Sequence, residues 1–126
     1  LTQLILQQKI DEVRSLVRDL TLQGEDEIKL IAIMLGQFRL YTQVKILQES
    51  GQTESQMVSS LGHYLGRNPN PYQIKFALRD TRGLSLNFLQ DSIRYLIQAD
   101  YQIKTGVYEK GYLFEKALLQ IASQSN

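Results

Sequence analysis

The chain has 126 residues, no cysteine and one histidine, and 14 Lys and Arg against 13 Asp and Glu give a formal net charge of +1 at pH 7. This length suits one domain with a substantial apolar core. The composition excludes disulfides, thiolate zinc sites and His-pair metal sites, and the balanced charge gives no global signal for nucleic acid or membrane.

The pattern of apolar and capping residues in the first part of the chain predicts two helices. Apolar residues recur at three- and four-residue spacing from Ile10 to Leu20, which is typical of an amphipathic helix. Asp26 is placed as the N-cap of a second helix over about residues 27–48. That helix is apolar around most of its circumference, so we expect it at the centre of the domain. Gly36 in its interior costs about 1 kcal/mol relative to Ala, and we expect a close approach by a neighbouring helix to offset this cost.

Four more helices are expected in the remainder. Thr53 and Gln56 form the pattern of a capping box. Asn70 and Pro71 end the clearest loop and are suited to begin a helix, and Ser85 is a good N-cap for the next one. Gly106 and Gly111 are expected to bracket the last turn. The expected helices are about residues 53–65, 71–82, 85–103 and 114–121.

The pattern therefore predicts an all-α fold, a single compact domain of about six helices over residues 1–126. No strand pattern, internal repeat or linker divides the chain. The longest apolar run, residues 30–35, is far too short to span a bilayer. Because the chain begins at Leu1 and not at Met, we expect it to be part of a longer protein.

The sequence offers little for catalysis. It has no phosphate-binding Gly-rich loop with its Lys, no nucleophile elbow and no paired-His motif. His63 is better explained as a surface or partly buried side chain than as a general base. The carboxylates near Arg14 and Arg18 are expected to form intrahelical ion pairs, and Asp100 is expected to pair with Lys104 one turn away. We expect no catalytic residue, no cofactor and no metal in this chain.

The helix over residues 71–82 carries the best candidate for a contact site. At 100° per residue, Ile74 and Ala77 fall on an apolar side that can pack on the core. The opposite side combines two aromatic rings with cations, which can bind phosphates while a ring stacks on an unpaired base. The rings can equally pack against a neighbouring helix or subunit, with the cations solvated around them. The candidate DNA or partner contacts are Tyr72, Lys75, Phe76, Arg79 and Arg82.

A stand-alone helix-turn-helix DNA-binding regulator is the alternative function. Residues 53–65 would be the positioning helix and residues 71–82 the recognition helix in a major groove. However, the connection from Gly66 to Pro71 is longer than the usual turn of three or four residues. The near-neutral charge is also unlike that of most such domains.

Three blocks of sequence resemble the C-terminal domain of bacterial DNA polymerase III δ subunits. Residues 28–40 are an apolar run that leads into Q-F-R-L, and residues 65–75 contain an N-P-Y loop-to-helix step. Residues 100–106 read D-Y-Q-I-K-T-G, similar to the end of a long helix in that family. The blocks occur in the family's order, and a Leu-rich terminal helix follows. The resemblance implies a helical domain like those of the clamp-loader collar.

The resemblance also implies a role. In this family the C-terminal domains of five clamp-loader subunits (δ, δ′ and three γ/τ copies) form a collar, and γ/τ hydrolyses ATP. The N-terminal AAA+-like region of δ, absent from this chain, binds and opens the β clamp. The chain would thus be an oligomerisation domain with γ/τ and δ′ as partners and primer–template DNA near the collar. It would act in the bacterial cytoplasm, at the nucleoid-associated replisome, with no membrane partner.

Four aromatic side chains lie off the main apolar stripes of their helices. Such residues are favoured at the cores of protein interfaces, so they are candidates for a subunit contact. Alternatively, they cover the edges of the domain's own core. The four residues are Phe88, Tyr95, Tyr108 and Tyr112.

Overall fold

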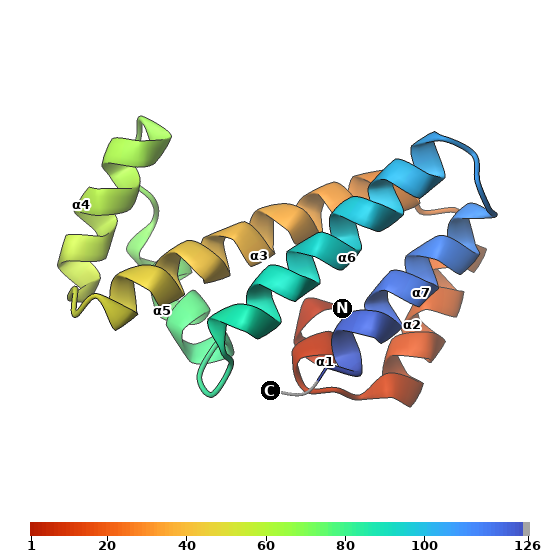
Figure 1. Ribbon diagram of the computed structural model, residues 1–126, viewed down its shortest axis with the longest axis horizontal. Helices are drawn as coiled ribbons and strands as arrows, with labels where there is room; N and C mark the ends of the chain where they lie inside the picture. Colours follow the sequence, from red (N-terminus) through yellow and green to blue (C-terminus); the bar gives the residue numbers. More distant parts are fainter. Residues whose placement is uncertain (125–126) are drawn as a thin grey trace.

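The computed structural model describes residues 1–124. Its two longest helices, α3 (Glu27–Glu49) and α6 (Leu86–Lys104), lie side by side in opposite directions at the centre of the fold (Figure 1). One end of this pair is covered by α1, α2 and α7, and the other end carries α4 and α5. The last two residues of the expected domain 1–126 lie outside the described residues. The helices are α1 (Thr2–Leu6), α2 (Ile10–Leu22), α3 (Glu27–Glu49), α4 (Glu54–Leu65), α5 (Pro71–Asp80), α6 (Leu86–Lys104) and α7 (Lys110–Ala122).

The all-α prediction is confirmed for residues 1–124, with seven helices where about six were expected. The additional helix is α1, which is too short to show a helical period in the sequence. It is held by tertiary contacts: Ile5 is fully buried, and the Thr2 hydroxyl donates a hydrogen bond to the Gln37 side chain on α3. Packing, not local propensity, therefore accounts for this helix.

The N-caps predicted from sequence are confirmed. Asp26 accepts a hydrogen bond from the backbone N–H of Ile28, and Thr53 forms a reciprocal capping box with Gln56. Like Asp26, the side chains of Asn70 and Ser85 accept a hydrogen bond from a backbone N–H in the first turn of α5 and α6, respectively. These side chains satisfy N–H groups that have no partner within the helix.

The start of α7 differs from the expectation. The Glu109 carboxylate accepts hydrogen bonds from the backbone N–H groups of Gly111 and Tyr112, at 2.9 and 3.0 Å. The helix therefore begins at Lys110 and not near Phe114. Gly111 lies inside the first turn of α7, so the prediction that it bounds a turn is wrong.

The core is formed mainly by α3, α6 and α7, each of which contributes six buried residues. Phe38, Phe88 and Phe114 are its largest fully enclosed side chains. Phe88 is only 2% exposed, so of the two alternatives for this ring, burial in the domain's own core is the one the structure supports. It belongs to the buried face of α6 because α6 is covered by both α3 and α7.

Helix α3 is central, as expected, but not enclosed on every side. It contacts α4, α5, α6 and α7, whereas Ile33 is half exposed. A Cβ placed on Gly36 would meet nothing within 4 Å, so the expected close approach at this residue is wrong. By length and composition α3 could cross a membrane, but a core helix meets the same criterion, and six of its side chains are buried in this domain.

Candidate functional site

Helix α5 is stabilised by local hydrogen bonds at both ends and packs on the core through its inner face. At its start, the Asn70 side chain accepts a hydrogen bond from the backbone N–H of Tyr72 at 2.9 Å. Ile74 and Ala77 are buried against the core. At its end, the buried Thr81 hydroxyl donates to the Ala77 carbonyl at 2.7 Å. The opposite side of the helix is therefore presented to solvent.

That exposed side carries the residues singled out from the sequence. Tyr72 and Phe76 are 65% and 50% exposed, which is high for aromatic rings. Lys75 and Arg79 are exposed on the same helix, and Arg82 is exposed just beyond its end. We call these five residues the α5 face. The structure brings them together on one surface, and their contact with DNA or a partner stays a prediction.

Arg79 is already engaged within the α5 face. Its guanidinium lies 4.8 Å from the centroid of the Phe76 ring, a cation–π arrangement. Its Nε and Nη2 atoms both donate to Asp80 Oδ1, at 3.1 and 3.0 Å. The Asp80 charge thus compensates part of the positive charge that Arg79 would offer to a phosphate. Lys75 and Arg82 have no ion pair among residues 1–124. Of the three cations on the α5 face, these two are therefore the most accessible to an anion.

Tyr41 on α3 connects this network to the centre of the fold. Its hydroxyl donates to Asp80 Oδ2 at 3.1 Å. Burial raises the pKa of Tyr41 well above its ordinary value of 10; the Asp80 charge and hydrogen bond raise it further, and Arg79 lowers it. Tyr41 therefore stays a neutral donor at physiological pH and fixes Asp80, which in turn orients Arg79. No sequence signal pointed to this contact, because Tyr41 and Asp80 are 39 residues apart.

Two shallow depressions flank the Arg79–Asp80 pair. One lies toward α3 and is lined by Gln37, Tyr41 and Phe76; the other lies toward α1 and includes Gln3 and Arg82. Both are open at the surface and lined by a mixture of polar and apolar groups, with aromatic rings only in the first, which suits contact with a macromolecule better than enclosure of a small substrate.

The other polar groups considered from the sequence have structural partners or are exposed. Lys104 Nζ lies 2.9 Å from Asp100 Oδ2, as predicted. The expected ion pairs within α2 are absent from the described residues, and Arg14 instead pairs with Glu115 on α7 at 4.0 Å. His63 is exposed on α4, and no group of three or more His, Cys, Asp or Glu in residues 1–124 is placed to hold a metal ion.

The remaining aromatic candidates differ in their burial. Tyr95 is half-buried against the core. Tyr108 and Tyr112 are 63% and 53% exposed, and their rings meet edge to face with centroids 6.1 Å apart. This pair, near the start of α7, is therefore available at the surface, unlike Phe88.

Comparison with known proteins shows which protein family this chain resembles in sequence and in structure. The family model described as DNA polymerase III delta subunit, C-terminal domain, matches residues 1–121. The DNA polymerase III subunit delta of Bacillus subtilis (strain 168) is 33% identical over 121 residues, which cover 96% of this chain and 33% of that protein. The solved structure of the Bacillus subtilis DNA clamp loader delta protein superposes with a TM-score of 0.79 at 32% identity, covering 96% of this chain and 34% of that one. The chain thus spans about a third of the length of these relatives.

Proposed function

Because the chain belongs to the family of DNA polymerase III δ subunits, as their C-terminal domain, we propose that it is the oligomerisation domain of δ in the clamp loader. In this proposal it holds δ in the pentamer that opens the β sliding clamp and loads it onto primed DNA. The observation that carries the proposal is the match over residues 1–121, together with the shared fold at a TM-score of 0.79.

The surface of the domain supports an assembly role. Among residues 1–124, twelve large apolar or aromatic side chains are exposed. Aromatic residues are enriched at the cores of protein interfaces, and clustered exposed apolar surface marks interaction sites. Most of these side chains lie on the α5 face, around α4 or near the junction of α6 and α7. They are Leu22, Ile33, Ile46, Tyr64, Leu65, Tyr72, Phe76, Ile97, Tyr101, Val107, Tyr108 and Tyr112.

The proposed partners follow from the family. They are the γ/τ and δ′ subunits, with the β clamp contacted through the N-terminal region and primer–template DNA near the collar. The domain acts without a catalytic site of its own, in the bacterial cytoplasm at the replisome. The hydrolysis of ATP belongs to γ/τ in this proposal.

Deletion of the domain tests the assembly role. The full-length subunit without residues 1–126 is expected to retain its affinity for the β clamp and to fail to co-elute with γ/τ and δ′ in size-exclusion chromatography. The reason is that the clamp-binding and assembly surfaces lie in different parts of the subunit. Co-elution of the truncated subunit with γ/τ and δ′ would refute the assembly role.

The isolated domain tests the helix-turn-helix alternative. A stand-alone regulator requires sequence-dependent binding of duplex DNA by the isolated domain. In the structure α4 and α5 are joined by residues 66–70, longer than the usual turn. We expect the isolated domain to show no preference among duplex sequences in fluorescence anisotropy titrations.

For the α5 face we propose a contact with the phosphates of primed DNA. Because Arg79 is paired with Asp80, the sharpest test removes the two unpaired cations. Lys75→Ala together with Arg82→Ala is expected to weaken binding of primed DNA by the assembled loader and to leave assembly unchanged. Each lost phosphate contact should reduce the slope of log affinity against log salt by about 1. Anisotropy titrations at several salt concentrations measure both effects.

A matched variant controls for the loss of charge alone. Lys29→Ala with Arg39→Ala removes two exposed cations from α3 that have no ion pair among the described residues. This variant should leave the affinity and its salt slope nearly unchanged. If the Lys75/Arg82 variant instead binds DNA normally but assembles poorly, the α5 face is a subunit contact and the DNA proposal is wrong.

A further inference from the structure

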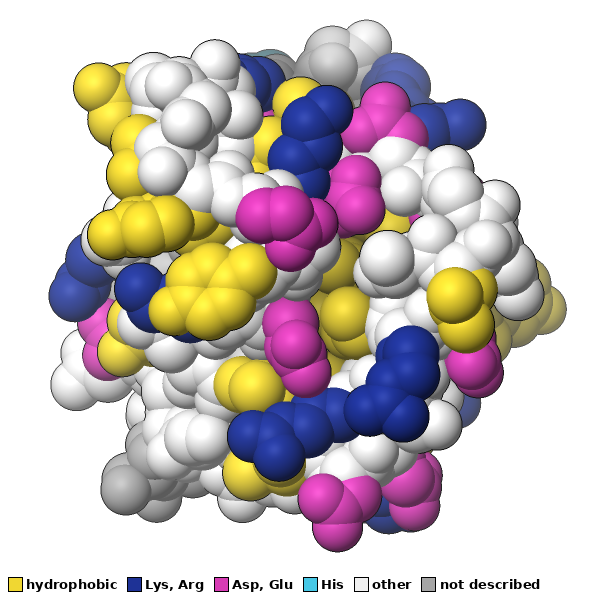
Figure 2. Space-filling model, turned by 90° about the vertical axis from the view of Figure 1, so that its right-hand side faces the viewer, with side chains coloured by type: hydrophobic (Ala, Val, Ile, Leu, Met, Phe, Trp, Pro, Cys, Tyr) yellow, Lys and Arg dark blue, Asp and Glu magenta, His cyan; other side chains and the backbone are white. Residues whose placement is uncertain are grey.

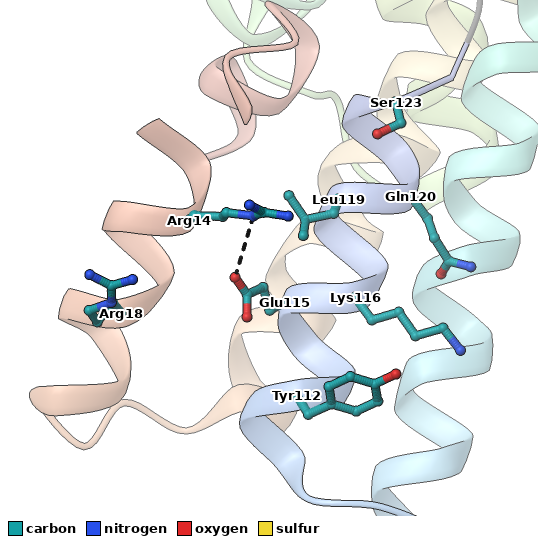
Figure 3. Close-up of a pocket in the computed structure, with 8 residues that line it drawn as sticks. All are labelled: Arg14, Arg18, Tyr112, Glu115, Lys116, Leu119, Gln120 and Ser123. Atoms are coloured by element: carbon teal, nitrogen blue, oxygen red, sulfur yellow. Dashed lines mark ion pairs between the residues drawn. The ribbon is translucent and has the colours of Figure 1, made fainter. Parts of the chain in front are cut away.

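An open groove runs between α2 and α7, with a volume of about 680 Å³. Figure 3 shows Arg14 extending from α2 toward Glu115 and Leu119 on α7, with Arg18 one turn further along α2. A second depression continues the groove to Glu109 at the start of α7. At 1.5 Å per residue, the groove follows α7 for about 20 Å. It is long enough for a short helix or an extended segment.

The accessible apolar surface of the groove comes from α7. Leu119 is half-buried and Tyr112 is 53% exposed, and both line the groove. On the α2 side, the residues that line the main groove are Arg14 and Arg18, while Val17 is buried beneath them. The groove therefore combines an apolar strip on α7 with cations on α2, which suits an amphipathic segment.

The charges that line the groove leave an excess of unpaired cations. Its two carboxylates are engaged: Glu115 pairs with Arg14 at 4.0 Å, and Glu109 caps the first turn of α7. Arg18 and Lys116 also line the groove and have no ion pair within residues 1–124. The carboxylates of α2 are not part of the lining. The space-filling view of this side of the molecule shows cationic and acidic side chains around sunken apolar surface (Figure 2).

We propose that this groove binds an acidic amphipathic segment of a neighbouring clamp-loader subunit; this inference rests on the assembly role proposed above. The apolar side of that segment lies against Leu119 and the Tyr112 ring, and its carboxylates pair with Arg18 and Lys116. Such charge-assisted hydrogen bonds favour an acidic protein partner. A nucleic acid fits less well, because its regularly spaced phosphates would also meet Glu109 and Glu115, whereas a peptide can place neutral or apolar residues opposite those two carboxylates.

Charge reversal in the full-length subunit tests the proposal. Arg18→Glu with Lys116→Glu is expected to weaken its association with γ/τ and δ′ about tenfold or more, with a marked salt dependence, because each reversal places like charges together. Lys29→Glu with Arg39→Glu makes the same change in net charge outside the groove and should leave association unchanged. Analytical ultracentrifugation measures association, and thermal unfolding checks that both variants fold.

Photo-crosslinking identifies the occupant even if charge reversal affects folding. A benzophenone amino acid in place of Gln120, which lines the groove, is expected to capture an acid-rich peptide of another clamp-loader subunit in the reconstituted complex. Crosslinks to DNA, or no protein crosslink, would overturn the inference. Normal assembly of the charge-reversed subunit would also overturn the groove proposal. The assembly role would still stand in that case if deletion of the whole domain abolishes co-elution.

Discussion

Replacing Phe88 by alanine should lower the free energy of unfolding of this domain by about 3–5 kcal/mol. Phe88 is 2% exposed, and its helix, α6, is covered by α3 on one side and α7 on the other. Removal of the ring loses its burial and leaves a cavity that three packed helices can close only in part. Urea unfolding followed by the helical circular dichroism signal measures the change.

Tyr101→Ala is the matched control for this prediction. Tyr101 is on the same helix but is 67% exposed. A substitution at such a surface position is expected to change stability by about 0.5 kcal/mol or less. If the two variants lose similar stability, or if Phe88→Ala impairs assembly without destabilising the domain, Phe88 would be an interface residue after all.

The second large effect is expected at Gly62, in the last turns of α4. A Cβ at this position would collide with the Asn68 side chain and lie 3.3 Å from the Asn68 Cα atom. Gly62→Leu is therefore expected to destabilise the domain by about 1–3 kcal/mol, since the backbone of the 66–70 connection must move to admit the new side chain. Because this connection leads into the cap at Asn70, the α5 face should be displaced as well.

Gly36→Ala is expected to have the opposite effect on stability to Gly62→Leu, although both glycines lie within helices. Nothing lies within 4 Å of a Cβ at Gly36, and the residue is inside α3. Alanine there should stabilise the domain by about 0.5–1 kcal/mol, because it reduces the freedom of the unfolded chain and favours the helix. Urea midpoints of the two glycine variants should thus move in opposite directions. A loss of stability in Gly36→Ala would contradict the exposed position of this residue.

The candidate site was predictable only in part. The periodicity of residues 71–82 was enough to place Ile74 and Ala77 inward and the five candidate residues outward. It was not enough to show that Arg79 is held by Asp80, or that Tyr41 holds Asp80 from another helix. Contacts of this kind depend on how α3 and α5 pack, and no local pattern encodes them.

The α2–α7 groove was missed for a related reason. The sequence led us to expect Arg14 and Arg18 to pair with carboxylates in their own helix. In the structure Arg14 reaches Glu115, about a hundred residues away in the sequence. Helical spacing shows which residues share a face, but the element opposite that face is known only from the tertiary structure.

The helices longer than two turns, and the residues that begin most of them, can be read from local sequence alone. Caps such as Asp26, Thr53 and Asn70 act on backbone groups two or three positions away, and amphipathic spacing acts within one helix, so both are visible locally. Three outcomes depend instead on tertiary packing: Phe88 is core while Tyr108 is at the surface, residues 2–6 form a helix, and backbone approaches Gly62 closely. These outcomes depend on which apolar faces meet, and packing energies arise from contacts between residues far apart in the chain.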